Sequence, residues 1–504
     1  AISQQIWDMK YRFKRADGEA IDKTIDDTFR RVGAALAQAE SRPEDYAIEF
    51  YEALRDFRFL PAGRIMSGAG TERDVTLFNC FVMGDIPDDM SGIFESLREA
   101  ALTMQQGGGI GYDFSTLRPK GAVVKGVGAD ASGPLSFMDV WDAMCRTIMS
   151  AGSRRGAMMA VMRCDHPDIE AFIEAKQEPG RLRMFNLSVL VSDDFMQAVK
   201  EDATWELTFN GTVYHSLPAR ELWEKIMRST YAYAEPGVIF IDRINRLNPI
   251  SYCETIHGTN PCGEQPLPPY GACLLGSVNL SRFVNDPFTG QASVDIQALT
   301  EIVTTAVRMM DNTIDVSRFP LPEQEQEAKA KRRIGLGITG LADALIMCNA
   351  RYGSAEAVRW TETWLKTIQR AAYLTSTELA KEKGAFPLFD KDAYLASEAL
   401  KNIDEDIREA IEAHGMRNAL LTSVAPTGTI SLFADNVSSG LEPVFSFAYT
   451  RHVMMPDGSR RDEEVTDYAY RLFRRLRGED IPLPAAFVDA QGLSPKDHLV
   501  MQAT

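Results

Sequence analysis

The sequence predicts an α/β protein behind a short helical region. Short apolar runs, such as 187–191, 238–241 and 420–425, alternate with longer amphipathic stretches, such as 218–233 and 355–383. Apolar runs of this length are typical of strands that are buried on both faces. Amphipathic stretches between such strands are typical of the helices that cover a sheet. This alternation therefore predicts a sheet with helices packed against it.

The first 58 residues predict helices instead. Residues 21–40 mix polar and apolar side chains without a helix breaker, and Pro43 is well placed to open a second helix. From Phe59 onward the hydrophobic pattern changes to short apolar runs that alternate with amphipathic stretches. We therefore predict a helical region over 1–58 and an α/β catalytic domain over 59–504. Three stretches without periodicity are expected to be long loops: 176–183, 247–270 and 317–330.

Composition excludes several classes of function. The chain has 504 residues, a net charge of −17 and 45% hydrophobic residues. A strongly acidic chain is a poor match for a nucleic-acid polymer, although one nucleotide needs only a local pocket. No apolar run is long enough to span a membrane, and no signal peptide is visible at the start. We expect a cytoplasmic enzyme without a membrane partner.

The seven cysteines do not form a disulfide scaffold. They are odd in number, scattered, and contain no CxxC pair, and the six histidines lack the spacing of metal ligands. We therefore expect no metal site. The cysteines are Cys80, Cys145, Cys164, Cys253, Cys262, Cys273 and Cys348.

The most informative segment is Asn260-Pro261-Cys262-Gly263-Glu264, which has the composition of a loop. A carboxylate beside a thiol raises the pKa of the thiol, so Cys262 would be a poor thiolate nucleophile. The neutral S–H remains suited to one-electron chemistry. Taken alone, a thiol near a carboxylate is more often structural. A second thiol, Cys273, follows eleven residues later.

Three further segments are ambiguous when each is taken alone. Cys80 lies in an apolar run, where a buried core thiol is the ordinary interpretation. Glycines at 107–111 let backbone approach a ligand or simply form a turn. The turn 425–431, which follows an apolar run, combines small hydroxyl residues with amides that can surround an anion.

Together these segments resemble the catalytic subunit of ribonucleotide reductases. The resemblance covers nearly the whole chain. It implies a ten-stranded α/β barrel, incomplete here, with its last strands and a cysteine tail expected after Thr504. The chain departs from the family pattern in having no nucleotide-binding cone domain ahead of residue 1 and in lacking those last segments, so we expect a fragment or one half of a split enzyme. Segments 438–445 and 254–268 resemble the adenosylcobalamin-dependent class most, which implies that cofactor.

The resemblance also implies roles for the residues. Cys262 would carry a thiyl radical, Glu264 would accept the proton of the substrate 3′-hydroxyl, and Asn260 would hydrogen-bond the substrate. Cys80 and Cys273 would be the redox dithiol. Gly63 stands where relatives often have Ser or Thr, which puts a side-chain contact there in doubt. The full substrate set is Gly63, Asn79, Cys80, Gly109, Asn260, Pro261, Cys262, Gly263, Glu264, Pro426, Thr427, Gly428, Thr429 and Ile430.

The implied ligands and partners are a ribonucleotide, most simply a diphosphate, a dNTP or ATP effector, and a thioredoxin-like reductant. The effector site of this family lies at a dimer interface, so we expect a homodimer. The loop 152–159 resembles the segment that links effector and substrate. The effector contacts would be Asp88, Asp89, Met90, Arg118, Lys125, Arg154 and Arg155.

Three alternatives remain open at this point. The chain could be the catalytic subunit of a class I reductase, which uses a separate metal-containing radical subunit. It could be a glycyl-radical enzyme of another reaction type, or a non-catalytic nucleotide-binding regulator. The GxGxxG match at 335–340 lacks a preceding strand, so we expect it to serve packing. The reductase interpretation requires Cys80 and Cys273 on adjacent strands, with Cys262 at a loop tip in the same cavity.

Overall fold

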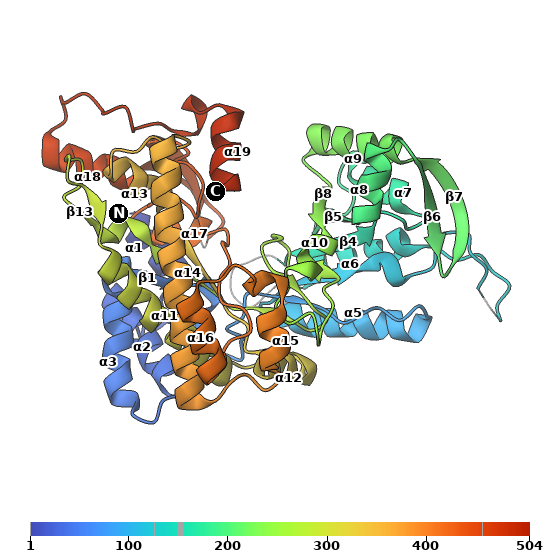
Figure 1. Cartoon of the computed structure of the whole chain (residues 1–504), viewed down its shortest axis with the longest axis horizontal. Coiled ribbons are helices and arrows are strands. Elements are labelled where there is room, and N and C mark those ends of the chain that lie inside the picture. The colour runs from blue at the N-terminus through green and yellow to red at the C-terminus, as the bar shows by residue number, and fades with distance from the viewer. Residues whose placement is uncertain (1, 125, 149–155, 456) are drawn as a thin grey trace.

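The computed structural model describes residues 2–124, 126–148, 156–455 and 457–504. Figure 1 shows two lobes, one of them rich in long helices and holding both ends of the chain. The other lobe carries β4, β5 and β8 with shorter helices around them. Within the described residues, no helix has both the length and the apolar character needed to cross a membrane.

A six-stranded sheet forms one wall of the interior. Its five consecutive members β2 to β8 run parallel to their neighbours, and β11 adds to the edge of β2 in the antiparallel direction. In order across the sheet the strands are β11 (Ala272–Cys273), β2 (Cys80–Val82), β3 (Gly109–Asp113), β4 (Met158–Arg163), β5 (Phe185–Val191) and β8 (Gly237–Phe240).

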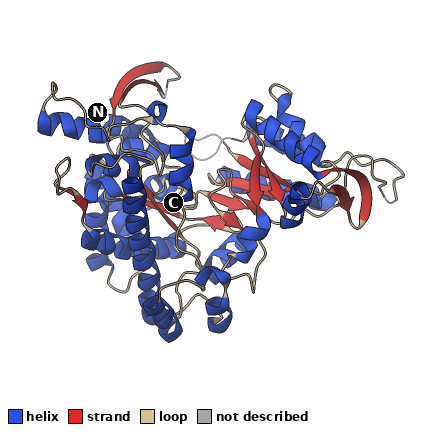
Figure 2. Cartoon of the chain, turned by 45° about the horizontal axis from the view of Figure 1, so that its top comes forward, coloured by secondary structure: helices blue, strands red, loops and turns tan. Residues whose placement is uncertain are grey.

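A three-stranded sheet forms the facing wall. It contains β1 (Phe59–Pro61), β12 (Leu275–Asn279) and β15 (Gly335–Thr339), with β12 in the middle. Because β11 and β12 are separated only by Leu274, one continuous segment belongs to both sheets. The Leu274 carbonyl accepts a hydrogen bond from the Gly335 amide at 2.8 Å, so the crossover point is itself paired. Figure 2 shows the strands gathered between the helices of the two lobes.

The α/β class is confirmed, but the count of ten strands is not. The described residues give sheets of six and three strands. The apolar run 420–425, predicted to be a strand, lies beside β15 but makes a single β-bridge, between Thr422 and Leu336. The remaining strands, of two to seven residues each, pair with one another and belong to neither sheet: β6 (Thr204–Phe209) with β7 (Thr212–Pro218), β9 (Gly258–Thr259) with β10 (Pro266–Leu267), β13 (Val284–Asn285) with β14 (Ser293–Val294), and β16 (Ala448–Met454) with β17 (Arg460–Thr466).

The helices begin where the sequence provides starting signals. Thr24 caps α2 (Ile25–Ala37) with a capping box, and Pro43 is the first residue of α3 (Pro43–Leu54). The amphipathic stretches form α9 (Ala219–Tyr233) and α14 (Ala355–Lys383), as predicted. The loop prediction for 317–330 was wrong, because α12 (Pro322–Lys331) begins at a proline and is too polar to show a periodic face.

The other helices complete the two lobes. They are α1 (Ile2–Ile6), α4 (Gly63–Gly68), α5 (Met90–Gln105), α6 (Pro134–Thr147), α7 (Ile169–Glu174), α8 (Asp193–Lys200), α10 (Ile241–Arg246), α11 (Ile296–Val316), α13 (Leu341–Met347), α15 (Lys391–Ala396), α16 (Glu405–His414), α17 (Gly428–Phe433), α18 (Tyr468–Arg477) and α19 (Pro495–Ala503). The boundary between 58 and 59 stays a prediction.

Candidate active site

Two thiols face each other at the edge of the six-stranded sheet. Cys80 on β2 lies directly opposite Cys273 on β11, as expected. Both are buried, and all seven cysteines are reduced thiols. Burial raises the pKa of Cys273 well above its usual range, and the hydrogen bond with Cys80 raises it further. Opposed residues of antiparallel strands have Cα atoms about 4.5–5.5 Å apart, which is within the span of a disulfide.

The loop that carries Cys262 is the tip of a short hairpin. Its arms, β9 and β10, pair in antiparallel fashion. Asn260 closes the tip, because its Oδ1 accepts a hydrogen bond from the Gln265 amide at 3.0 Å. Asn186 on β5 donates to the Pro261 carbonyl at 2.7 Å, which ties the tip to the sheet. Cys262 is exposed at this tip.

Glycines on both walls make room for the hairpin. A Cβ atom on Gly111 of β3 would lie 2.0 Å from the Thr259 carbonyl oxygen. On the facing wall, a Cβ on Gly335 would lie 2.3 Å from Nε2 of Gln265. Neither site can hold a side chain without displacing the hairpin. The structure thus supports the packing interpretation of the GxGxxG match.

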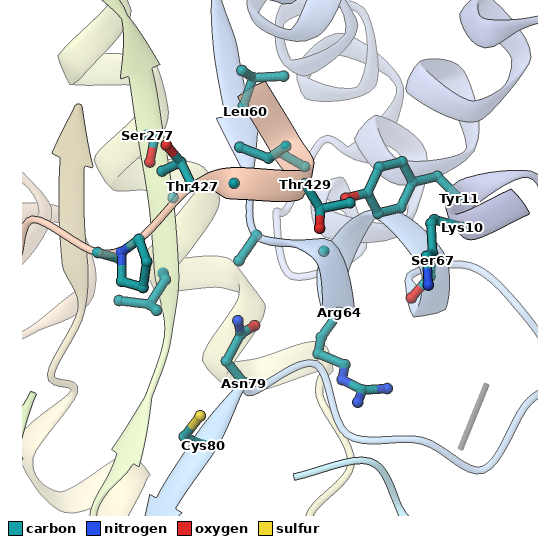
Figure 3. Close-up of a pocket in the computed structure, with 18 of the residues that line it drawn as sticks. Lys10, Tyr11, Leu60, Arg64, Ser67, Asn79, Cys80, Ser277, Thr427 and Thr429 are labelled. Atoms are coloured by element: carbon teal, nitrogen blue, oxygen red, sulfur yellow. The ribbon is translucent and has the colours of Figure 1, made fainter. Parts of the chain in front are cut away.

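A cavity of about 730 Å³ joins these parts. Cys80, Cys262 and Glu264 line it together, and so does the turn 425–430. Figure 3 shows Asn79 beside Cys80, with Thr427 and Thr429 across from them. Predicted residues from three distant segments therefore share one cavity of the size of a ligand pocket. The predicted residues that do not line it are Gly109, Asn260, Pro261, Gly263 and Cys273.

Two amide side chains in this region, one half-buried and one buried, each have a buried polar atom without a hydrogen bond. Oδ1 of Asn79 and Nδ2 of Asn260 find no hydrogen-bond partner among the described residues. Leaving a buried polar group unsatisfied costs about 1–3 kcal/mol, so a hydrogen bond from a ligand or a water to either atom would be favourable. Gly109 lies nearby, where a Cβ would be 3.0 Å from the Cys80 sulfur and 3.1 Å from the Pro261 ring.

The turn 425–430 leads into α17 and is held in place through the side chain of Thr427. Thr427 occupies the N-cap position, but its side chain does not cap the helix. Instead, its Oγ1 accepts a hydrogen bond from the Gly440 amide at 2.7 Å and lies 2.9 Å from Oγ1 of Thr339. The backbone amides at the start of the turn are therefore not used by this side chain.

A pair of buried carboxyl groups, Asp343 and Asp467, is linked to the Thr339–Thr427 contact through Ser438. Oδ2 of Asp343 accepts from the Ser438 amide at 3.0 Å, and the Ser438 carbonyl accepts from Thr339 at 3.1 Å. Burial, followed by the neighbouring charge of Asp467, raises the pKa of Asp343 well above its usual range. Burial also raises the pKa of Asp467. Two carboxyl groups at such close range favour sharing one proton.

Comparisons with known proteins agree with this geometry. A family model described as "Ribonucleotide reductase, barrel domain" matches residues 78–482, and one described as "Ribonucleotide reductase, all-alpha domain" matches residues 1–74. The chain belongs to the ribonucleotide reductase large-subunit family. The family resemblance inferred from the motifs is thereby confirmed.

Two relatives of the reductase family cover nearly all of the chain. The chain is similar to the "Vitamin B12-dependent ribonucleoside-diphosphate reductase" of Mycobacterium tuberculosis, with 39% identity over 96% of this chain and 70% of the relative. It is also similar to the protein of the same name from Thermoplasma acidophilum, with 36% identity over 96% of this chain and 62% of the relative. The "Ribonucleoside-diphosphate reductase large subunit" of Vaccinia virus is 29% identical, over 81% of this chain and 58% of that protein.

Sequence reasoning missed the part of this reductase cavity that comes from the N-terminal segment. Residues 8–12 line the cavity, together with Arg64 and Ser67 of α4. The segment reaches the site because α1 packs on α17, where Ser3 Oγ donates to the Phe433 carbonyl at 2.6 Å. No local pattern signals such a contact. Gly63 also lines the cavity, and a Cβ there would lie 3.5 Å from the ring of Tyr11.

Four of the predicted effector residues lie around the start of α5 or contact that region. Arg118 binds Asp88 through Nε, at 3.0 Å, and through its backbone amide, at 3.1 Å. Asp89 caps α5, and Met90 is exposed. The other three, Lys125, Arg154 and Arg155, lie outside the described residues. The effector role of this group stays a prediction.

Proposed function

We propose that this chain reduces ribonucleoside diphosphates to 2′-deoxyribonucleoside diphosphates through a thiyl radical on Cys262. The observation that carries the proposal is the shared cavity, which Cys80, Cys262 and Glu264 line together, with Cys273 directly opposite Cys80 on the neighbouring strand. The relatives from Mycobacterium tuberculosis and Thermoplasma acidophilum, which are named as B12-dependent diphosphate reductases, support the reaction and its cofactor.

The ribose is the part of the substrate that must reach the thiols. The Cys262 thiyl takes the hydrogen atom from C3′ and becomes a neutral thiol. Glu264 takes the proton of the 3′-hydroxyl, and the 2′-hydroxyl leaves as water after it receives a proton from the dithiol. The leftover polar atoms of Asn79 and Asn260 suit hydrogen bonds to the sugar hydroxyls.

Electrons and atoms balance through the dithiol. Cys80 and Cys273 together supply two electrons and two protons and end as a disulfide. One proton leaves with the 2′-hydroxyl as water, and one hydrogen replaces that hydroxyl at C2′. Cys262 returns its hydrogen to C3′, and Glu264 returns its proton to the 3′-oxygen. The net change is ribonucleotide plus dithiol to deoxyribonucleotide, water and disulfide.

The residues at the loop tip fit a radical source that approaches from outside. Cys262 is exposed and lines a cavity of about 730 Å³, so its sulfur is accessible to a large group. Adenosylcobalamin, when bound, supplies one-electron oxidation of this thiol by homolysis of its carbon–cobalt bond. The chain's own contribution is to hold Cys262 on a hairpin clamped between two walls, so that the radical forms beside the ribose.

The partners and the setting belong to the same proposal. A thioredoxin-like protein or an equivalent dithiol reduces the disulfide after each turnover, in the cytoplasm. A dNTP or ATP effector binds near Asp88, Asp89, Met90 and Arg118, at the interface of a homodimer. The exposed Met90 and the start of α5 support a contact surface in that region.

One experiment tests the proposal against its alternatives. The purified chain is incubated with CDP, adenosylcobalamin and dithiothreitol, and dCDP is measured. We expect dCDP that depends on the cofactor. Formation only with an added metal-containing radical subunit would indicate the class I reaction. CDP binding without product under either condition would leave a nucleotide-binding regulator and contradict the proposal.

A further inference from the structure

The strand that carries Cys273 has little hydrogen bonding of its own. β11 has two residues, Ala272 and Cys273, and lies at the edge of the six-stranded sheet. The register of so short a strand depends on the segments that lead into it and out of it. On one side, the Leu274 carbonyl accepts a hydrogen bond from the Gly335 amide. On the other side, the position of β11 depends on the turn 268–271.

This turn contains a strained tyrosine. The Gly271 amide donates a hydrogen bond to the Pro268 carbonyl at 2.9 Å, which closes a four-residue turn. Tyr270 occupies the third position with a φ of 63°, in the left-handed region that favours glycine or asparagine at such a position. A tyrosine keeps this conformation only where its surroundings hold it there. The contacts of the Tyr270 side chain therefore identify what holds the turn.

Two neighbouring segments hold the side chain of Tyr270. A Cβ on Gly84, just after β2, would lie 2.6 Å from Cζ of the ring, so the ring lies directly against the backbone there. The hydroxyl donates a hydrogen bond to the carboxylate of Glu99 on α5, at 3.0 Å from Oε2. The backbone adds a third contact, because the Val82 amide donates to the Gly271 carbonyl at 2.9 Å. The turn is thus tied both to the strand that carries Cys80 and to α5.

We propose that Tyr270, bound to Glu99, is a positioning residue that holds Cys273 at the distance from Cys80 that a disulfide requires. This inference rests on the proposed function, which makes the two thiols the electron donor. A disulfide closes only where the two Cβ atoms are about 3.5–4.5 Å apart, so a small shift of β11 disfavours it. A turn that is fixed in advance also reduces the chain entropy lost on closure.

The test measures the disulfide itself. The purified chain is equilibrated in glutathione buffers, where glutathione disulfide accepts the two electrons and two protons that the thiols lose. Free thiols are then alkylated, and the Cys80–Cys273 disulfide is quantified by peptide mass spectrometry. For Tyr270→Phe we expect the equilibrium constant of disulfide formation to fall about ten-fold, because a hydrogen bond to a carboxylate is lost. Tyr231→Phe, on α9 and 95% exposed, is the matched control and should leave the constant unchanged.

Variants of Glu99 separate positioning from general stability. Glu99→Ala should lose as much as Tyr270→Phe, and the double variant should lose no more than either single one, because both remove the same hydrogen bond. Glu99→Gln keeps an acceptor oxygen but not the charge, so we expect a loss of only about three-fold. A purely structural role would lower the unfolding temperature of these variants without changing the equilibrium constant.

The outcomes distinguish this inference from the proposed function. An unchanged equilibrium constant in folded Tyr270→Phe and Glu99→Ala variants would overturn the inference, while dCDP formation by the wild-type chain would leave the function standing. The expected losses in a wild-type background that forms no dCDP would support the positioning role and contradict the function. A wild-type chain in which Cys80 and Cys273 never form a disulfide would overturn both.

Discussion

Cys80 and Cys273 are register partners on antiparallel strands, in the same pairing that places Phe81 opposite Ala272. A disulfide can therefore close without sliding either strand. Because both side chains are buried, the pair is protected from oxidants in bulk solvent, and its reduction requires a reagent that enters the cavity. This arrangement distinguishes the proposed redox pair from the five other thiols.

Loss of either partner should stop turnover. Cys80→Ser and Cys273→Ser remove one of the two electron donors, so we expect no repeated formation of dCDP in an assay with dithiothreitol. Cys145→Ser, Cys164→Ser and Cys348→Ser are controls, because these buried thiols lie in α6, after β4 and after α13, and not on the paired strands β2 and β11. Failure of the Cys145 variant in the same manner would mean that the redox pair has been assigned wrongly.

Cys262→Ser should separate chemistry from binding. A hydroxyl cannot form the required radical at this position, so dCDP formation should fall below detection. The affinity for CDP should stay within a few-fold of wild type, because the thiol acts on C3′ and contributes little to ground-state binding. Measurable turnover by this variant would rule out Cys262 as the radical residue.

Gly111→Ala should displace the Cys262 hairpin, although Gly111 lies on β3 and is not part of the hairpin. The new methyl group would lie 2.0 Å from the Thr259 carbonyl oxygen, so the hairpin must move. We expect the free energy of unfolding to fall by about 1–3 kcal/mol, as for other overpacked sites, and turnover to fall about a hundred-fold, because an error of roughly 1 Å in placement has that effect.

Gly290→Ala is the matched control for the hairpin prediction, since no atom lies within 4 Å of the new Cβ. It should leave both the unfolding midpoint and the turnover unchanged. Normal turnover in a folded Gly111→Ala variant would show that the hairpin does not need its present position.

Stability should depend on pH through the carboxyl pair behind the turn. The folded state raises the pKa of both Asp343 and Asp467, so folding favours their protonated forms. Their contribution is fully present below the unfolded pKa of about 4 and is lost as pH rises through the raised values. Denaturant unfolding across this range should therefore show the free energy of unfolding decreasing with pH.

Asp343→Asn should flatten that slope. The amide cannot ionise, so the raised pKa of Asp343 no longer contributes to the slope. Asp457→Asn, in the exposed β16–β17 turn, is the control and should retain the wild-type decrease. An unchanged slope in Asp343→Asn would show that the pair does not share a proton.

The parts of the site that were predictable are those carried by short, local segments. The Asn260–Glu264 loop, the Cys80 run and the 425–430 turn each have a composition that limits their backbone, and the family resemblance relates them to one another. The structure puts all three against one cavity. The order of α2, α3, α9 and α14 was equally accessible, because caps and periodicity are local signals.

The parts that were not predictable depend on contacts between distant segments. Nothing in the sequence of residues 8–14 indicates that the ring of Tyr11 packs against Phe433. This contact holds the N-terminal segment against the cavity. The partnership of Asp343 with Asp467 likewise arises only when α13 and α18 pack. The strand count could not be obtained because Thr422 makes one bridge where a full strand was expected.

The segment 272–279, which belongs to both sheets, also constrains how the chain can fold. Its partners are Phe59 on β1, Cys80 on β2 and Gly335 on β15, all far away in sequence. Such long-range pairings lose loop-closure entropy before they gain contacts, so they form late and slowly. On the ribosome, β2 must wait for its partner until Cys273 has been synthesised, and β1 must wait until Val278. Until then they present open strand edges, which is the period in which a nascent chain of this kind is most exposed to aggregation.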